Sequence, residues 1–397
     1  MKKLRIGILF GGRSGEHEVS LLSAASVLEA IDHTRYDVQL IGITKDGRWL
    51  TAGDAADLLP SPKRETHSLR AGDPGATASA ALLEHGHDVV LSPVPGHTDA
   101  AGNSLATLRA SAERSLGVDV IFPVLHGTFG EDGTVQGLLE LADLAYVGSG
   151  VLGSAAGMDK DVMKRLFVAA KLPIPKHLTF LRREWRENPR HVKRQIEAAL
   201  RYPMFVKPAN LGSSVGISKA HDRSELDVAI DLAAGFDRKV VIEQSIGGRR
   251  GKARELEVAV LGNDAPEASV VGEVIPCKEF YDYEAKYLSE GSELVIPAEL
   301  TKAETKRVQQ MAIAAFRACD CAGMARVDFL MEPGNPKSGN PRKSYLNEVN
   351  TLPGFTAISM YPKLWQASGL TYGKLIDRLI ELALERHVEK QASHYSR

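Results

Sequence analysis

The start of the chain alternates between short apolar segments and one amphipathic segment, and this order restricts the chain to few folds. Residues 4–10 and 38–44 have the composition of buried strands, and residues 20–31 have the pattern of an amphipathic helix. A strand-helix-strand order with short Gly-rich turns is typical of a parallel sheet covered by helices. We therefore predict an α/β fold that begins with a parallel-sheet domain.

The length of 397 residues is more than one simple core requires, so we expect two or three domains. The pattern indicates a strand at 118–125 and a helix from about 158 to 170. Residues 51–117 have the composition of a variable insertion with one strand at 88–92, and residues 332–343 that of a long hairpin loop. Further strands are indicated at 204–207, 216–218, 240–243, 256–261, 326–330 and 345–349, before a last helix at 372–386.

The composition excludes several classes of protein. A net charge of −1 argues against a general nucleic-acid binder, which needs a basic excess. The apolar run after Met1 is broken by Arg5 and ends at a Gly-Gly pair, so it indicates a buried strand and not a secretion signal. No run approaches the roughly 18 apolar residues of a membrane span. Three cysteines form no disulfide framework, which favours a reduced, cytoplasmic location.

Two loops carry residues suited to bind ligands. Glu16 lies between the first strand and the first helix, where it suits a substrate ammonium group or simply complements the helix dipole. The segment from Phe205 to Gly216 joins two predicted strands and contains Lys207, Ser213 and Ser214. Close backbone N–H groups, hydroxyls and a lysine suit phosphate oxygens, although a bland hairpin would explain the glycines alone.

The most informative pattern lies on two late strands. Arg326 and Asp328 share one face of the first, and Glu348 and Asn350 share one face of the second. If these strands pair, two carboxylates and an amide oxygen come together, which is a donor set suited to Mg²⁺ with phosphates. The alternative is a solvated strand face with a salt bridge.

Two further segments resemble known motifs. Residues 278–287 interleave aromatic and charged residues between apolar strands, as in a lid or in a mobile surface loop. Residues 148–153 match the dinucleotide pattern G-x-G-x-x-G, but no acidic residue follows at 171–176. We therefore exclude a nicotinamide-dependent dehydrogenase.

Taken in order, seven motifs resemble the D-alanine–D-alanine ligase family of the ATP-grasp fold. They extend from residue 4 to about residue 386, and they are GGRSGEHEVS, HGTFGEDGTVQG, GSGVLGSAAGMDK, FVKPANLGSSVGISK, EFYDYEAKY, RVDF and NEVNTLPGF. The resemblance implies a three-domain ATP-grasp fold, with an N-terminal domain at 1–125, a central domain at 126–240 and a C-terminal domain at 241–397. ATP is held between the central and C-terminal domains in this family.

The resemblance also implies roles for individual residues. Glu16, Ser213 and Tyr287 would hold the first D-alanine and the closed lid, and Arg326 with the Gly354 N–H would stabilise the oxyanion. His126, Ser359 and Met360 would lie near the second D-alanine. The expected ATP contacts are Lys160, Lys207, Ser213, Ser214, Glu243, Glu255 and Lys286, and the expected ligands of two Mg²⁺ or Mn²⁺ ions are Asp328, Glu348 and Asn350.

The implied activity is ATP-dependent joining of two D-alanines for cell-wall precursor synthesis, by a homodimer that acts on small molecules. The turn at residues 249–254 is longer than usual in the family, which affects the placement of Glu255. A D-alanine–D-lactate ligase is the nearest alternative, and Tyr287 favours the dipeptide. A non-catalytic nucleotide sensor is the alternative from another class, and it would bind ATP without turnover.

Overall fold

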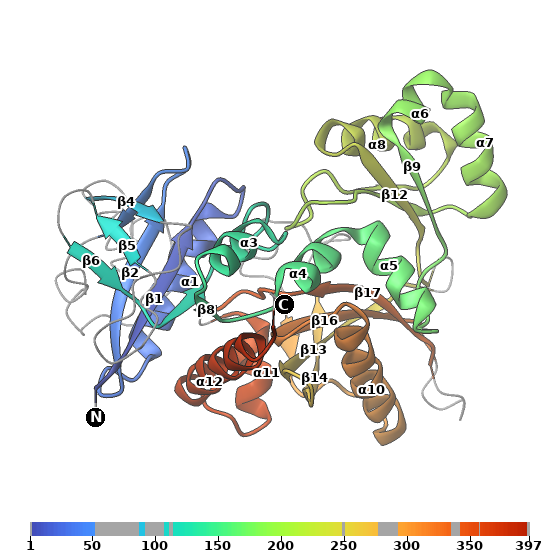
Figure 1. Cartoon of the computed structure of the whole chain (residues 1–397). Helices are drawn as coiled ribbons and strands as arrows, with labels where there is room; N and C mark the ends of the chain where they lie inside the picture. The colour runs from blue at the N-terminus through green and yellow to red at the C-terminus, as the bar shows by residue number, and fades with distance from the viewer. Residues whose placement is uncertain are drawn as a thin grey trace.

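The structure is a computed structural model that describes residues 2–51, 87–91, 107–110, 114–247, 251–276, 293–334, 342–356 and 358–394. Within these residues the strands form three sheets (Figure 1). The first has the order β6-β5-β4-β3-β2-β1-β7-β8. Its strands are β1 (Leu4–Gly11), β2 (Tyr36–Ile43), β3 (Trp49–Thr51), β4 (His87–Leu91), β5 (Thr107–Ala110), β6 (Arg114–Gly117), β7 (Val120–Pro123) and β8 (Ala145–Tyr146).

The first sheet is parallel only in part. Strands β2, β1, β7 and β8 run parallel, whereas β3 to β6 are added in antiparallel pairs. The predicted first strand, helix and second strand are confirmed as β1, α1 (His17–Ala30) and β2, and the strand predicted at 88–92 is β4. Strands β5 and β6 were not predicted. The sheet also continues beyond residue 125, because β8 pairs with β7.

The second sheet is antiparallel, in the order β11-β10-β12-β9. Its helices begin at residues suited to cap them. Asn188 accepts a hydrogen bond from His191 N with Pro189 at the first helical position, and Asp222 accepts one from Ser224 N. The elements are β9 (His177–Leu181), α6 (Arg182–Glu187), α7 (Pro189–Ala199), β10 (Met204–Pro208), β11 (Ser218–Ala220), α8 (Arg223–Phe236) and β12 (Lys239–Gln244).

The third sheet is also antiparallel, in the order β15-β14-β13-β16-β17. Helix α10 packs its Val308 and Phe316 against one face of this sheet. A capping box formed by Thr301 and Glu304 starts that helix. The elements are β13 (Arg254–Gly262), β14 (Glu267–Ile275), β15 (Glu293–Val295), α10 (Lys302–Ala318), β16 (Gly323–Met331), β17 (Ser344–Asn350), α11 (Met360–Ala367) and α12 (Tyr372–Gln391).

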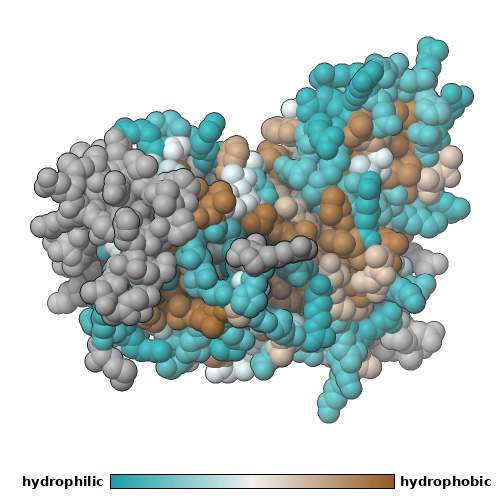
Figure 2. Space-filling model, in the orientation of Figure 1, coloured by the Kyte–Doolittle hydropathy of each residue, from teal (hydrophilic) through white to brown (hydrophobic). Residues whose placement is uncertain are grey.

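Two consecutive helices connect the first sheet to the second. Helix α3 (Thr134–Leu141) precedes β8, and α4 (Val151–Met158) and α5 (Lys160–Ala169) follow it. The predicted single helix near 158–170 is therefore α5, which Asp159 caps by accepting hydrogen bonds from two backbone N–H groups. A notch separates the lobe of β9 to β12 and α6 to α8, at upper right, from the N-terminal lobe (Figure 2).

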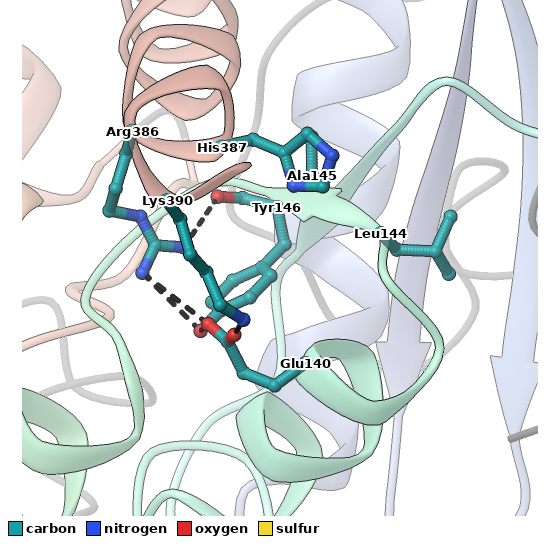
Figure 3. A pocket seen from close by; sticks show the side chains of 7 residues that line it. All are labelled: Glu140, Leu144, Ala145, Tyr146, Arg386, His387 and Lys390. Atoms are coloured by element: carbon teal, nitrogen blue, oxygen red, sulfur yellow. Dashed lines mark hydrogen bonds and ion pairs between the residues drawn. The ribbon is translucent and has the colours of Figure 1, made fainter. Parts of the chain in front are cut away.

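Helix α12 joins the two ends of the chain. Leu375 and Leu379 of α12 share one hydrophobic core with Ile8 of β1 and Phe122 of β7. At the far end of α12, the Arg386 guanidinium stacks 4.2 Å from the centre of the Tyr146 ring and donates to the Tyr146 carbonyl at 3.2 Å (Figure 3). The first and third sheets are thereby held together. No described helix combines the length and the apolar character that crossing a bilayer would require.

Candidate active site

The loop between β10 and β11 has the form that the sequence indicated, a connection between two antiparallel strands. Lys207 lies near the end of β10, and Ser213 and Ser214 have positive φ angles of 48° and 61°. Such angles are uncommon outside glycine and occur in turns and at functional sites. Lys160, at the start of α5, supports the loop by donating to the Leu211 carbonyl at 2.8 Å.

Glu16 joins this loop to the N-terminal sheet. It precedes α1, its side chain is buried, and the Ser213 hydroxyl donates to its carboxylate. Its carboxylate lies between two glycines, because a Cβ added to Gly127 or Gly212 would lie 2.6 Å or 2.7 Å from Glu16 Oε2. A side chain at either position would require this carboxylate to shift. The structure therefore brings Glu16 and Ser213 together, as predicted.

His126 connects the N-terminal sheet to the loop that follows β17. Its side chain is buried, with Nε2 2.9 Å from Ser23 Oγ and Nδ1 3.2 Å from the Leu352 carbonyl oxygen. Because a carbonyl only accepts, Nδ1 carries the proton and donates, and Nε2 accepts from the serine. Burial lowers the pKa of His126, which favours the neutral ring, although Glu16 opposes this effect.

Glu131 is a carboxylate in the same region that the sequence analysis did not select. Its Oε1 accepts a hydrogen bond from Gly127 N at 2.9 Å and lies 3.9 Å from His126 Nδ1. Burial raises the pKa of Glu131 to about 8, and the negative charge of Glu16 adds to the effect. Two carboxyl groups thus flank Gly127, one of which holds a proton more readily than usual.

Strands β16 and β17 pair in the register that the sequence pattern requires. Arg326 stands opposite Asn350, and Asp328 stands opposite Glu348. Arg326 donates to Asp328 through Nε at 2.8 Å and Nη2 at 2.7 Å, and Asn350 Nδ2 donates to Asp328 Oδ2 at 3.0 Å. The predicted grouping of these side chains is therefore present.

Glu257 on β13 completes this group and was not predicted. Its Oε2 lies 3.0 Å from Arg326 Nε, and the register places Glu257 opposite Asp328. Glu257 is 8% exposed, so the ion pair is largely screened from water. Arg326 therefore lies between two carboxylates that belong to adjacent strands.

A β-bulge at Asn347 joins the second sheet to the third. Asp328 pairs with Glu348 and Phe329 pairs with Leu346, so Asn347 is left without a ladder partner. Its side-chain oxygen accepts from Lys207 Nζ at 3.3 Å, and its carbonyl accepts from Lys164 Nζ at 3.3 Å. The strand that carries Lys207 thus contacts the strand that carries Glu348.

Glu243 of β12 lies between the same two lysines. Its Oε1 is 3.0 Å from Lys164 Nζ, and its Oε2 is 3.1 Å from Lys207 Nζ. Burial alone would raise the pKa of Glu243, but the two lysines more than offset this and lower it to about 2. Glu243 is therefore ionised, and two lysines share its charge.

The donor set of Asp328, Glu348 and Asn350 fits a hard divalent cation. All three side chains offer oxygen, although in this structure Asn350 contacts Asp328 through its amide nitrogen and not through its oxygen. Among the described residues, no three His, Cys, Asp or Glu side chains gather closely enough to hold a metal ion. The expected set needs only two carboxylates, because the amide of Asn350 supplies the third oxygen.

The loop after β17 places Gly354 and Ser359 side by side. A Cβ on Gly354 would lie 2.9 Å from Ser359 Oγ, and that hydroxyl contacts Thr356 Oγ1 at 2.7 Å. Met360 begins α11 with its side chain in the core, so only its backbone is left to face a small ligand.

Glu255 lies on β13, two residues from Glu257 and on the same strand face.

Not every predicted residue can be placed. Tyr287 and Lys286, with the rest of the predicted lid at 278–287, lie outside the described residues. The structure adds three residues, Lys164, Glu257 and Glu131, of which Glu131 lies within the motif HGTFGEDGTVQG and was not selected there. Lys164 lies four residues after Lys160 on one helix face, which is the only pattern in the sequence that could have indicated it.

Comparisons with known proteins agree with this arrangement. The family model described as "D-ala D-ala ligase N-terminus" matches residues 5–149, and the one described as "D-ala D-ala ligase C-terminus" matches residues 166–381. A protein named D-alanine–D-alanine ligase from Chloroherpeton thalassium is 50% identical, over 98% of this chain and 99% of its own length. One from Bacillus cytotoxicus is 47% identical over the full length of both chains.

Solved structures match over the whole fold as well. A D-alanine–D-alanine ligase from Coxiella burnetii superposes with a TM-score of 0.77 and 34% identity, covering 98% of this chain and 97% of that chain. A D-Ala:D-Ser ligase from Enterococcus faecalis has a TM-score of 0.78 and 35% identity, covering 96% and 100%. The expected ATP-grasp fold is thereby confirmed. The two family models and the full-length relatives together establish that this chain belongs to the D-alanine–D-alanine ligase family.

Proposed function

We propose that this chain uses ATP to join two D-alanines into D-alanyl-D-alanine for peptidoglycan precursors, with the group around Arg326 as its catalytic centre. The observation that carries the proposal is the meeting of three segments. Lys207 lies just before the loop between β10 and β11, which we call the phosphate loop, and it contacts Asn347. The residue after Asn347 is Glu348, and Arg326 and Asp328 lie on the strand that pairs with it. A nucleotide phosphate, a cation and a reacting carboxylate can therefore be held side by side.

The residues expected to bind ATP divide by chemistry. Lys160, Lys207 and the backbone at Ser213 and Ser214 suit the phosphates, because they offer positive charge and N–H groups. Glu243 and Glu255 suit the base and the ribose, which present amino and hydroxyl donors. Lys286 would approach the γ-phosphate from the lid.

Asp328, Glu348 and Asn350 would hold Mg²⁺ or Mn²⁺. A bound cation of this kind neutralises the negative charge that accumulates on a phosphoryl group during its transfer. The side chains of this chain supply the remaining positive charge, from Lys207 and Arg326.

The first chemical step transfers the γ-phosphoryl group of ATP to the carboxylate of the first D-alanine. A carboxylate oxygen of D-alanine bonds to the γ-phosphorus, and the bond between that phosphorus and the oxygen that bridges it to the β-phosphate breaks. The products are an acyl phosphate and ADP. Glu16, held by Ser213 and the two neighbouring glycines, would bind the ammonium group of this D-alanine. This contact would direct the carboxylate of the bound D-alanine toward the phosphate loop.

The second step forms the peptide bond. The amine of the second D-alanine attacks the carbonyl carbon of the acyl phosphate, and inorganic phosphate leaves after the amine has lost a proton. Arg326 and the Gly354 N–H would stabilise the tetrahedral oxyanion. His126, Ser359 and the Met360 backbone would position the second D-alanine, with Tyr287 at the lid.

The organisation of the whole protein is part of the proposal. Each sheet marks one domain, and the notch between the second sheet and the rest of the molecule is where ATP would enter. We propose that the protein acts in the cytoplasm as a homodimer on small molecules.

The decisive experiment is phosphate release with ATP, Mg²⁺ and D-alanine, with L-alanine as the control. We expect release with D-alanine alone and D-alanyl-D-alanine as the product. Parallel reactions with added D-lactate and D-serine test the second site, since one structural neighbour is titled a D-Ala:D-Ser ligase. Activity with L-alanine and none with D-alanine would reverse the assignment, and ATP binding without turnover would favour a nucleotide sensor.

A further inference from the structure

Lys164 is a fully buried lysine for which the proposed reaction has no use. Its side chain is 0% exposed, and it points from α5 toward β12 and β17. Burying a charged amine is costly unless other charges and acceptors compensate for it. Burial lowers the pKa of Lys164, and Lys207 lowers it further, whereas Glu243 opposes both effects. The cost of burying Lys164 indicates that its charge has a role in the protein.

The contacts of Lys164 converge on the residue that is expected to bind phosphate. Lys164 Nζ contacts one oxygen of the Glu243 carboxylate at 3.0 Å, and Lys207 Nζ contacts the other oxygen at 3.1 Å. Both lysines also bind Asn347, one through the carbonyl and the other through the side chain. The bulge at Asn347 turns both of these acceptors toward the lysines.

The charges of this cluster do not cancel. Two lysine ammonium groups contact the single carboxylate of Glu243, so these three side chains carry one net positive charge; Glu348 acts on Lys164 through its charge. Without Lys164, the carboxylate of Glu243 would face Lys207 alone, and the two would neutralise each other in a buried, low-dielectric site. Lys207 would then be drawn toward Glu243 and away from a nucleotide.

We infer that Lys164 is a positioning residue that compensates the charge of Glu243 and so keeps Lys207 available to the phosphates of ATP. The inference rests on the proposed role of Lys207 in binding phosphate. It explains why a lysine on a linker helix is buried against the end of the nucleotide-binding strand. It also assigns a role to the bulge at Asn347, because the carbonyl and the side-chain oxygen of this residue hold the two ammonium groups in place.

The first test compares Lys164→Met with the wild-type enzyme. Because a charged hydrogen bond to phosphate is weakened, the KM for ATP should rise about tenfold, while the KM for D-alanine changes by less than about twofold. Lys193→Met is the matched control, since Lys193 binds one carboxylate, Asp227, between α7 and α8 in the same lobe. That control should lower the melting temperature and leave the KM for ATP unchanged.

The second test removes the carboxylate that Lys164 compensates. In the Lys164→Met/Glu243→Gln double variant, no negative charge is left to attract Lys207, so the KM for ATP should return to that of Glu243→Gln alone. This comparison holds even if Lys164→Met does not fold, because the double variant buries no unpaired charge. A folded Lys164→Met enzyme with the wild-type KM for ATP would overturn the inference. A double variant about tenfold worse than Glu243→Gln would overturn it as well.

A third variant separates this inference from the proposed function. Lys207→Met should raise the KM for ATP if Lys207 binds phosphate. If Lys207→Met leaves that KM unchanged, the role of Lys207 is wrong and the role of Lys164 falls with it. If Lys207→Met raises the KM and Lys164→Met does not, the proposed function stands and only the Lys164 inference fails.

Discussion

Arg326 binds Asp328 through two parallel hydrogen bonds, Nε to Oδ1 at 2.8 Å and Nη2 to Oδ2 at 2.7 Å. The expected oxyanion donor therefore holds the expected metal ligand, on the same face of β16. Such a bidentate pair fixes both the position and the direction of the guanidinium group. Strand β16 thus fixes the relative position of two residues of the proposed site.

The first prediction concerns Arg326→Ala. The variant loses one of two oxyanion donors, so kcat should fall by about 10²–10³, with little change in the KM for ATP. Phosphate release at saturating ATP measures this. Arg342→Ala is the control, because Arg342 makes a similar pair with Glu304, at 2.8 Å and 2.9 Å, outside the proposed site. A near-normal rate for Arg326→Ala would remove Arg326 from the mechanism.

The second prediction concerns Glu257→Gln. In the variant Asp328 is the carboxylate that remains paired with Arg326 among the residues that the structure describes, so the guanidinium competes more strongly with Mg²⁺ for it. The Mg²⁺ concentration for half-maximal activity should rise about three- to tenfold, and kcat should fall less than in Arg326→Ala. Titration of activity with Mg²⁺ measures the first effect. An unchanged Mg²⁺ requirement would show that Glu257 only fills space.

The third prediction concerns the pH dependence of Glu131. Because burial raises its pKa from about 4.5 to about 8, the folded protein binds more protons than the unfolded protein between these values. Stability should therefore fall as the pH rises through this window, by at most about 1.4 kcal/mol per pH unit from this group. Glu131→Gln keeps an acceptor for Gly127 N and removes the titration.

Melting temperatures of the two proteins at pH 5, 6.5 and 8 check this prediction. The melting temperature of Glu131→Gln should rise relative to that of the wild type at each increase in pH, because the wild type must ionise a buried carboxyl group. A difference that stays constant across this range would mean that Glu131 is ionised throughout.

The fourth prediction concerns Arg386→Ala, which removes the contact between α12 and β8 (Figure 3). A stacked guanidinium contributes roughly 0.5–2 kcal/mol, so the melting temperature should fall by a few degrees. Activity at 25 °C should be retained, because the residue lies outside the proposed site. A thermal scan and a rate measurement on the same preparation test both parts, and Arg378→Ala, on the same helix, serves as the control.

The sequence predicted the elements that repeat a clear period and the residues that form ordered motifs. Strand β1, helix α1 and the pairing of Arg326 with Asp328 follow from spacing alone, since neighbours on one strand face lie two residues apart. The predicted strand at 216–218 begins later, at Ser218, because the positive φ angles of Ser213, Ser214 and Gly216 extend the loop.

What the sequence did not indicate depends on contacts between distant segments. Lys164 binds the carbonyl of Asn347, 183 residues later, and no local pattern announces such a contact. Glu257 faces Arg326 because β13 pairs with β16, which is a property of strand order in the sheet. Strands β5 and β6 were missed because the Ala- and Gly-rich composition of residues 51–117 hides short strands.

The core shared by β1 and α12 has a consequence for how the protein is made. Ile8 belongs to the same buried core as Leu375 and Leu379, which the ribosome adds long after it. Because α1 also belongs to this core, the nascent N-terminal sheet emerges with one apolar face only partly covered until α12 has been synthesised. A polypeptide shortened before α12 would expose that face permanently, and we expect it to aggregate during expression.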